Sequence, residues 1–127
     1  MNVLNIADAT AFERSGLTSR LLLDEATHPE SQLAITWVDV QPGARQIPHS
    51  HTPEQVYVIV AGTGTMHLDG QTFPVRRGDR VYIPSGAVHG ITNTGETLLQ
   101  YVSAAAPSFD ITAAYEAGAL RPEHYKP

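Results

Sequence analysis

The chain has 127 residues, no cysteine, and a formal net charge of −5 at pH 7. The lack of cysteine excludes disulfides, cysteine-ligated zinc, iron–sulfur clusters and thiol nucleophiles. The 8 basic residues are scattered, so no basic face for nucleic acid is visible. The N-terminus has no secretory-signal pattern, and no apolar run approaches the roughly 20 residues that span a bilayer. We therefore expect one cytoplasmic domain over residues 1–127, with neither nucleic acid nor membrane as a partner.

Short strands separated by turn residues are expected along most of the chain. They lie within residues 19–25, 31–43, 54–64, 65–75, 76–86, 87–93 and 96–104. Asp69-Gly70 is a strong two-residue hairpin signal, because both positions tolerate positive φ. Strands at this close spacing, with no helix between them, indicate an all-β sandwich or barrel. Residues 1–18 are weakly patterned, and the chain after Pro107 predicts a short helix that stops near Gly118 and Pro122.

Two histidines, His49 and His51, stand one residue apart just before the expected strand at 54–64. Alternate side chains of an extended chain share a face, so these histidines, Gln55 and Tyr57 are predicted to line one wall. Two neutral imidazoles about 7 Å apart on one face can hold one transition-metal ion. The alternative is a pair of surface histidines in a polar loop, and this short pattern alone does not decide between the two.

A third histidine follows a tight turn in the segment GDRVYIPSGAVHGITN, residues 78–93. The turn Pro84-Ser85-Gly86 fixes where the next strand starts, and therefore fixes the position of His89. The two segments together resemble the two motifs of the cupin family. The matching residues are Gly43, His49, His51, Gln55 and Gly62 in the first motif, and Gly78, Pro84, Gly86, His89 and Asn93 in the second.

The resemblance covers roughly residues 32–104 and implies a double-stranded β-helix, or jelly-roll barrel, with short irregular extensions at both ends. It implies a homodimer paired through outer sheets, and a small-molecule substrate. It also implies one divalent transition metal, which could be Zn, Fe, Mn, Ni, Co or Cu. The implied ligands are His49, His51, Gln55 and His89.

Gln55 departs from the carboxylate that is usual at its motif position. Glu54 lies next door but is predicted to face the other way, and whether it replaces Gln55 as a ligand stays open. Three imidazoles and one amide leave the full charge on a divalent ion, which favours Lewis-acid chemistry such as isomerisation, cyclisation or elimination. A metal-dependent dioxygenase of the quercetinase-like kind is the alternative, and a non-catalytic ligand-binding or sensor module is a further one. A vestigial or purely structural metal site is the remaining alternative.

Other candidate residues follow from strand parity. Arg45 shares the parity of the histidine pair and could bind an anionic substrate, although a solvated strand residue is the simpler interpretation. Tyr57 could transfer a proton in catalysis, or serve only as a core aromatic. Trp37, Met66 and Tyr101 are expected to fill the barrel or line its cavity.

Overall fold

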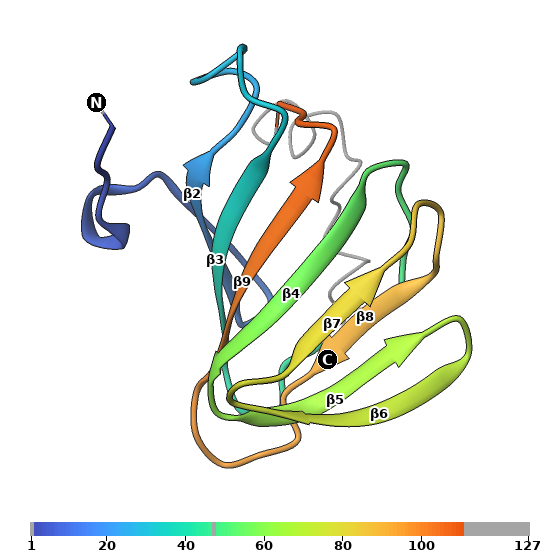
Figure 1. Cartoon of the computed structure of the whole chain (residues 1–127). Helices are drawn as coiled ribbons and strands as arrows, with labels where there is room; N and C mark the ends of the chain where they lie inside the picture. Colours follow the sequence, from blue (N-terminus) through green and yellow to red (C-terminus); the bar gives the residue numbers. More distant parts are fainter. Residues whose placement is uncertain (1, 47, 111–127) are drawn as a thin grey trace.

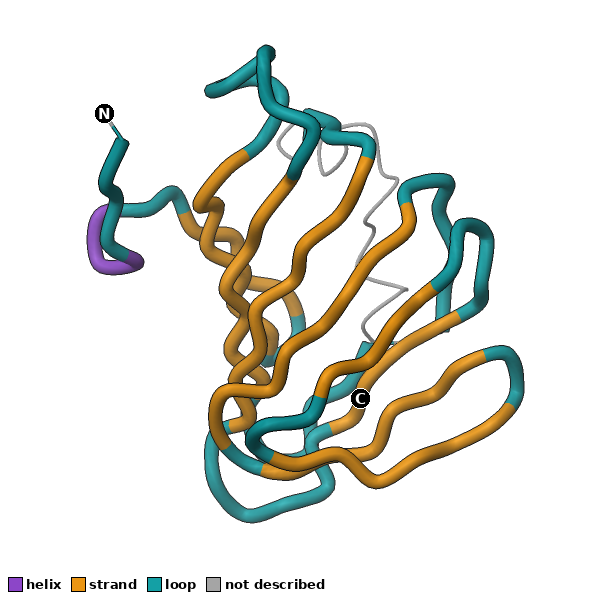
Figure 2. The backbone as a smooth tube through the Cα atoms, viewed as in Figure 1, coloured by secondary structure: helices purple, strands orange, loops and turns teal. Residues whose placement is uncertain are grey.

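The computed structural model describes residues 2–46 and 48–110. Within this part the chain forms one short 3-10 helix and nine strands (Figure 1, Figure 2). These elements are η1 (Ile6–Asp8), β1 (Ala11–Arg14), β2 (Leu17–Leu23), β3 (Ala34–Val40), β4 (Glu54–Ala61), β5 (Thr63–Leu68), β6 (Gln71–Arg76), β7 (Arg80–Ile83), β8 (His89–Thr92) and β9 (Leu99–Ala106). No helix among the described residues is long and apolar enough to cross a membrane. The helix predicted towards the C-terminus falls outside the described residues from position 111 onwards.

The strands form two antiparallel sheets. The larger sheet has six strands in the order β1-β2-β3-β9-β4-β7, and the smaller has three in the order β6-β5-β8. In Figure 1 the strands of the larger sheet run side by side from β2 to β7, and the smaller sheet lies at the lower right. The predicted all-β class is confirmed. Within the weakly patterned N-terminal segment, however, β1 pairs with β2 as an edge strand that the sequence did not predict.

The core lies between the two sheets, because each strand turns alternate side chains inwards. β9 shows this alternation over its whole length, from Leu99 to Ala106. Its inward residues join a buried cluster that includes Tyr57 of β4, Met66 of β5 and Ile91 of β8. Met66 is 0% exposed and Tyr101 is 1% exposed, so both pack in the interior as the sequence predicted.

The hairpin between β5 and β6 forms as the sequence predicted. Asp69 and Gly70 have φ values of 47° and 81°, and Leu68 pairs with Gln71 on either side of them. A two-residue turn with both φ values positive matches the right-handed twist of the paired strands. The turn therefore sets the register of the smaller sheet.

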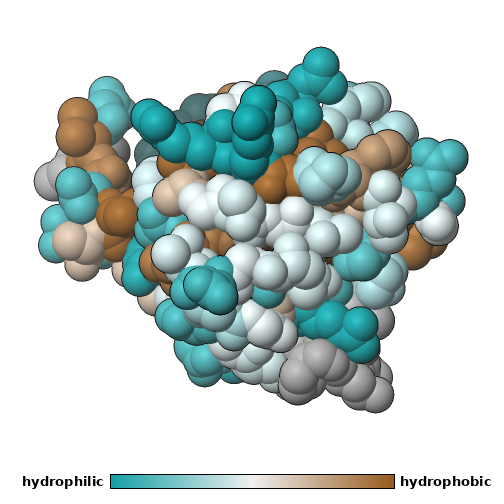
Figure 3. Space-filling view, turned by 90° about the horizontal axis from the view of Figure 1, so that it is seen from below, coloured by the Kyte–Doolittle hydropathy of each residue, from teal (hydrophilic) through white to brown (hydrophobic). Residues whose placement is uncertain are grey.

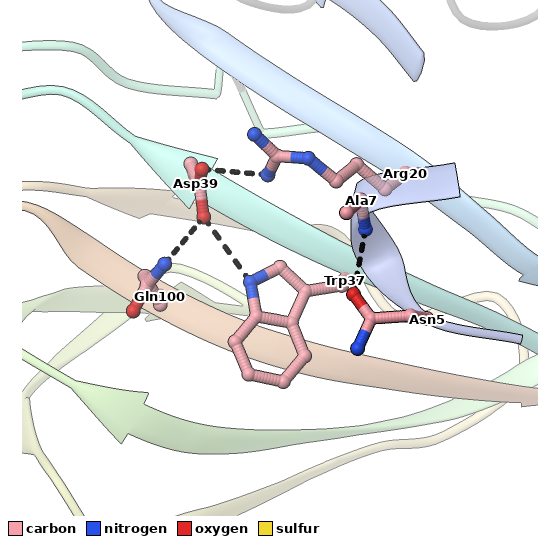
Figure 4. Close-up of polar contacts among 6 residues, drawn as sticks. All are labelled: Asn5, Ala7, Arg20, Trp37, Asp39 and Gln100. Carbon is pink, nitrogen blue, oxygen red and sulfur yellow. Dashed lines mark hydrogen bonds and ion pairs between the residues drawn. The ribbon is translucent and has the colours of Figure 1, made fainter. Parts of the chain in front are cut away.

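Trp37 was predicted to face the interior, and that prediction is wrong. It lies on the outer face of the larger sheet, where its indole Nε1 donates to Asp39 Oδ1 at 3.2 Å (Figure 4). Arg20 Nη1 donates to Asp39 Oδ2 at 2.6 Å and Gln100 Nε2 donates to Oδ1 at 2.8 Å, so the carboxylate is well satisfied although it is only 8% exposed. Asp39 and Trp37 have the same strand parity, and the polar partner keeps the indole on this face.

The N-terminal segment adds little to the core. None of the residues of η1 is buried, and Asn5 caps it by accepting from the Ala7 amide at 2.9 Å. Val3 and Leu4 are 79% and 44% exposed. Hydrophobic colouring gathers at the left edge of Figure 3, the side on which Figure 1 places this segment.

Candidate metal site

His49 and His89 are held side by side by their own backbones. Each amide donates to the carbonyl of the other residue at 2.8 Å, which makes an isolated antiparallel bridge between the two motif segments. The two ring centroids lie 4.6 Å apart. The backbone therefore places two imidazoles next to each other although they are far apart in sequence.

His51 is docked onto the second motif by the turn that precedes His89. The Gly86 amide donates to the His51 carbonyl at 2.9 Å, and Gly86 itself has a φ of 78°, which favours glycine. The His51 ring lies 4.8 Å from the His89 ring, centroid to centroid. Its Nδ1 lies 2.9 Å from the Pro53 carbonyl oxygen and donates to it, which leaves Nε2 as the nitrogen with a lone pair.

His89 is fully buried and presents an unpaired nitrogen. Its Nδ1 donates to the Ala87 carbonyl at 2.9 Å, while its Nε2 has no hydrogen-bond partner among the described residues. The pKa of His89 is lowered to about 4, chiefly because the ring is buried; the neighbouring His51 contributes to the lowering, whereas the Ala87 carbonyl and Asp69 oppose it. The ring is therefore neutral near pH 7, which is the form that binds metal.

The loop before His89 is clamped by the β5–β6 turn. The Val88 amide donates to Asp69 Oδ1 at 2.9 Å, and the Asp69 amide donates to the Val88 carbonyl at 2.8 Å. The β5–β6 turn of the smaller sheet thus fixes Val88, which directly precedes the candidate ligand His89. Sequence reasoning identified Asp69 only as a turn residue, and nothing in the sequence signals this second contact.

The three histidines are positioned to bind one metal ion. One ring nitrogen from each of His49, His51 and His89 lies within 4.8 Å of the others. Imidazole nitrogens bind transition metals at about 2.1 Å, so nitrogens this close can share an ion after small side-chain rotations. The buried, unpaired Nε2 of His89 fits this donor set, because a coordinated metal would satisfy it.

Gln55, and not Glu54, lies beside the histidines. Gln55 Oε1 is 2.9 Å from His51 Nε2, and its Nε2 donates to Ser103 Oγ at 2.5 Å. Glu54 is exposed on the other face of β4, where Oε1 accepts from the Tyr82 hydroxyl at 3.1 Å. The role of Gln55 as a fourth ligand stays a prediction, although its position is the one that the role requires.

A small pocket of about 70 Å³ opens beside the histidines, and Tyr57, Gln46 and Tyr101 form a polar chain along its wall. The Tyr57 hydroxyl donates to Gln46 Oε1 at 3.3 Å, and Gln46 Nε2 donates to the Tyr101 hydroxyl at 3.4 Å. The two tyrosine rings stack at 4.2 Å, and the Tyr57 ring lies 6.1 Å from that of His89. None of the described residues that line the pocket is Lys, Arg, Asp or Glu. The pocket suits a ligand small enough to fit beside the histidines.

Arg45 is exposed and does not line this pocket, whereas its neighbour Gln46 is buried and does. Arg45 forms a β-bridge with Thr92, and His49 forms one with His89. Between the two bridges the first segment therefore advances four residues, whereas the second advances three. One extra residue of this kind is a β-bulge, and it reverses the side on which the following side chains point. Parity therefore placed Arg45 on the wrong face, and its substrate-binding role stays a prediction without support from the pocket.

Comparisons with known proteins agree with this geometry. A family model described as "Cupin domain" matches residues 36–104. An oxalate-binding protein from Thermotoga maritima is 34% identical over 86 residues, which are 67% of this chain and 70% of that protein. Dimethylsulfoniopropionate lyase DddW from Ruegeria pomeroyi is 30% identical over 91 residues, 72% of this chain and 60% of the lyase. The crystal structure of a predicted oxalate decarboxylase from Thermotoga maritima superposes with a TM-score of 0.75 at 24% identity, covering 83% of this chain and 98% of that one.

Proposed function

The chain belongs to the cupin family, and from this premise we propose that it binds one divalent transition metal and converts a small organic substrate by Lewis-acid chemistry. The proposed ligands are His49, His51, His89 and Gln55. The observation that carries the proposal is the convergence of three imidazoles on one point, with the buried Nε2 of His89 left unpaired. An isomerase, cyclase or lyase fits this chemistry.

The uncharged ligand set favours an anionic substrate. A divalent ion held there would polarise a carbonyl or stabilise an enolate or carboxylate. The imidazoles and the amide do not offset its charge, and the described pocket lining has no acidic side chain. A substrate with a carboxylate or enolate oxygen would supply the missing negative charge.

Tyr57 is the proposed proton-transfer residue. Its hydroxyl lies on the pocket wall and is held by Gln46 Oε1 at 3.3 Å, so its direction is fixed before a substrate arrives. Burial of the ring, which is 2% exposed, keeps bulk water away from the hydroxyl. To give a proton to a bound substrate, the hydroxyl would turn its hydrogen from Gln46 Oε1 towards the pocket.

The relatives support two versions of this proposal. The similarity to a lyase favours elimination as the reaction type. The similarity to a protein named for binding oxalate favours small carboxylates as ligands, and it also supports the alternative that this chain binds a ligand without converting it. Dioxygenase chemistry is the other enzyme alternative, and consumption of oxygen would distinguish it.

Metal titration tests the proposal directly. The chain, stripped with a chelator, is titrated calorimetrically with Mn²⁺, Fe²⁺, Co²⁺, Ni²⁺, Cu²⁺ and Zn²⁺, and its melting temperature is measured with each ion. We expect one ion per chain and a higher melting temperature. His49→Ala should lose at least 100-fold in affinity, because it removes one of the proposed ligands and second-sphere changes alone cost 10–100-fold. His28→Ala, which removes a half-buried histidine outside the pocket, is the matched control. An unaltered affinity in His49→Ala would refute the ligand set.

We also propose that two copies pair through the outer face of the larger sheet. Trp37, Val102 and Val58 form a row of outward side chains across β3, β9 and β4. Val58 is 42% exposed and Tyr82, on the neighbouring β7, is 44% exposed. Trp37 and Val102 are half-buried, so the row is partly exposed, and an apolar patch on a sheet face can form a protein interface. A cytoplasmic location remains a prediction from the sequence.

A further inference from the structure

Two hydroxyl-bearing side chains lie next to each other on the pocket wall, on the inner face of the larger sheet. Ser103 of β9 is paired with Tyr57 of β4 on one side and with Thr36 of β3 on the other. All three residues line the pocket beside the histidines. Facing residues of antiparallel strands have Cβ atoms about 4.5–5.5 Å apart. The Ser103 and Thr36 hydroxyls are therefore close enough for one oxygen atom of a ligand to contact both.

Both hydroxyls have hydrogen-bonding capacity that the described part of the chain does not use. The Thr36 hydroxyl forms no hydrogen bond with another described residue. Ser103 Oγ is hydrogen-bonded to Gln55 Nε2 at 2.5 Å. That bond uses only part of its capacity, because a hydroxyl has one hydrogen and two lone pairs. The two hydroxyls can therefore still bind a polar group of a ligand, whichever way the Gln55 amide is turned.

The neighbouring row of the same pocket wall is small and apolar. Ala105 of β9 is paired with Ala34 of β3 on one side and with Gln55 of β4 on the other. Phe109 packs against the buried cluster that contains both alanines, and its carbonyl accepts from the Glu25 amide at 3.0 Å. A ligand that extends from Gln55 across β9 to β3 therefore meets hydroxyls along one edge and methyl groups along the other.

We propose that the pocket binds a short hydroxycarboxylate, with its carboxylate at the three histidines and a hydroxyl further along its carbon chain at Thr36 and Ser103. The inference deepens the proposed function and rests on it, because the proposed metal supplies the charge that holds the carboxylate. The rest of the ligand is uncharged, since none of the described residues that line the pocket is Lys, Arg, Asp or Glu. Thr36 is then a specificity-determining residue, because its hydroxyl distinguishes a hydroxylated carbon from a methyl group.

The test compares two acids that differ by one hydroxyl. Lactate ends in a methyl group where glycerate ends in CH₂OH, and both have the same carboxylate and the same hydroxyl beside it. In calorimetry with the zinc-loaded chain, glycerate should bind about tenfold more tightly than lactate, as expected from one or two additional hydrogen bonds. Thr36→Val keeps the shape of the side chain without its hydroxyl. It should reduce the preference for glycerate to less than about threefold and leave the affinity for lactate unchanged.

Two further variants serve as controls. Thr36→Ser keeps a hydroxyl and should keep the preference for glycerate. Thr18→Val removes a hydroxyl from the outer face of the same sheet, opposite Asp39, and should bind both acids as the natural chain does.

Equal affinities for glycerate and lactate in the natural chain would overturn the inference, and so would a preference that is undiminished in Thr36→Val. Zn²⁺ binding, measured first, separates this inference from the proposed function. If the chain binds Zn²⁺ but neither acid, the hydroxycarboxylate pocket is refuted and the metal site stands. If the chain does not bind Zn²⁺, the proposed metal site fails and the inference fails with it.

Discussion

Acidification should destabilise the metal-free protein through His89 in particular. Burial lowers the pKa of this ring to about 4 from an ordinary value of 6.5. Between those pH values the unfolded chain binds a proton that the folded chain does not, so folding stability falls as the pH falls through this window. A shift of this size corresponds to about 3 kcal/mol, at roughly 1.4 kcal/mol per pH unit. His89 is 0% exposed, so solvent screening does not reduce this figure. The loss is a large share of a typical domain's stability of about 5–15 kcal/mol.

Urea unfolding of the chelator-stripped chain between pH 7 and pH 4 measures this effect. The natural chain should lose about 3 kcal/mol more over that range than His89→Gln, which carries no titrating group at this position. His89→Gln is less stable overall, so only the dependence on pH is compared. His28→Gln removes a half-buried histidine away from the candidate site and should show the same dependence on pH as the natural chain. Parallel pH curves for the natural chain and His89→Gln would refute the assignment of a buried neutral imidazole.

Three further predictions concern the ligand set, the proton-transfer residue and the interface. Gln55→Glu should keep or tighten metal binding in calorimetry yet alter turnover, because a carboxylate lowers the effective charge of the ion, whereas Glu54→Gln should leave affinity unchanged. Tyr57→Phe should lower kcat on a substrate found by screening by about 10²–10⁴-fold while Zn²⁺ affinity is retained, and an unchanged kcat would exclude a catalytic hydroxyl. Val58→Arg should convert a dimer to a monomer in sedimentation experiments while Gln71→Arg, on the smaller sheet, does not. A natural chain that is already monomeric would contradict the proposed interface.

The motif glycines explain why the fold could be recognised from sequence. Gly62 has a φ of 82°, and a Cβ on it would lie 2.5 Å from the Leu98 carbonyl oxygen, so no other residue fits there without movement. Gly86 has a φ of 78° and closes the turn that docks onto His51. Glycine is required at these positions by the local backbone conformation. The spacing of such glycines along the chain therefore indicates where the turns lie. This is why the motif residues and their spacing indicated the family, whereas the closely spaced short strands indicated the all-β class.

Positions that depend on strand parity were less predictable. The bulge between Arg45 and His49 cannot be seen in the sequence, because it depends on how this segment pairs with residues 89–92. Because of this bulge, Gln46 lines the pocket wall and Arg45 does not. The prediction that Trp37 faces the interior was wrong for a related reason. Both faces of β3 carry apolar residues, so the sequence pattern did not show which face points inwards. Asp39 lies on the same face of β3 as Trp37, and its charge was the sequence feature that indicated an outward direction for both.

Contacts between side chains that are distant in sequence were beyond prediction. Ser103 is separated from Gln55 by most of the barrel's sequence, and it meets the amide only because β9 lies beside β4. Asp69 reaches Val88 in the same way, through the packing of a turn against a loop. No local pattern distinguishes either residue from an ordinary strand or turn residue. They become visible only when the topology is known.

The paired backbone hydrogen bonds between His49 and His89 have a consequence for the order of events during synthesis. The two residues are about 40 positions apart, so their bridge closes a long loop and can form only after β8 has left the ribosome. A growing chain that ends before β8 offers at most two of the three imidazoles. The complete set of three imidazoles is therefore available to a metal only after both motif segments have been synthesised.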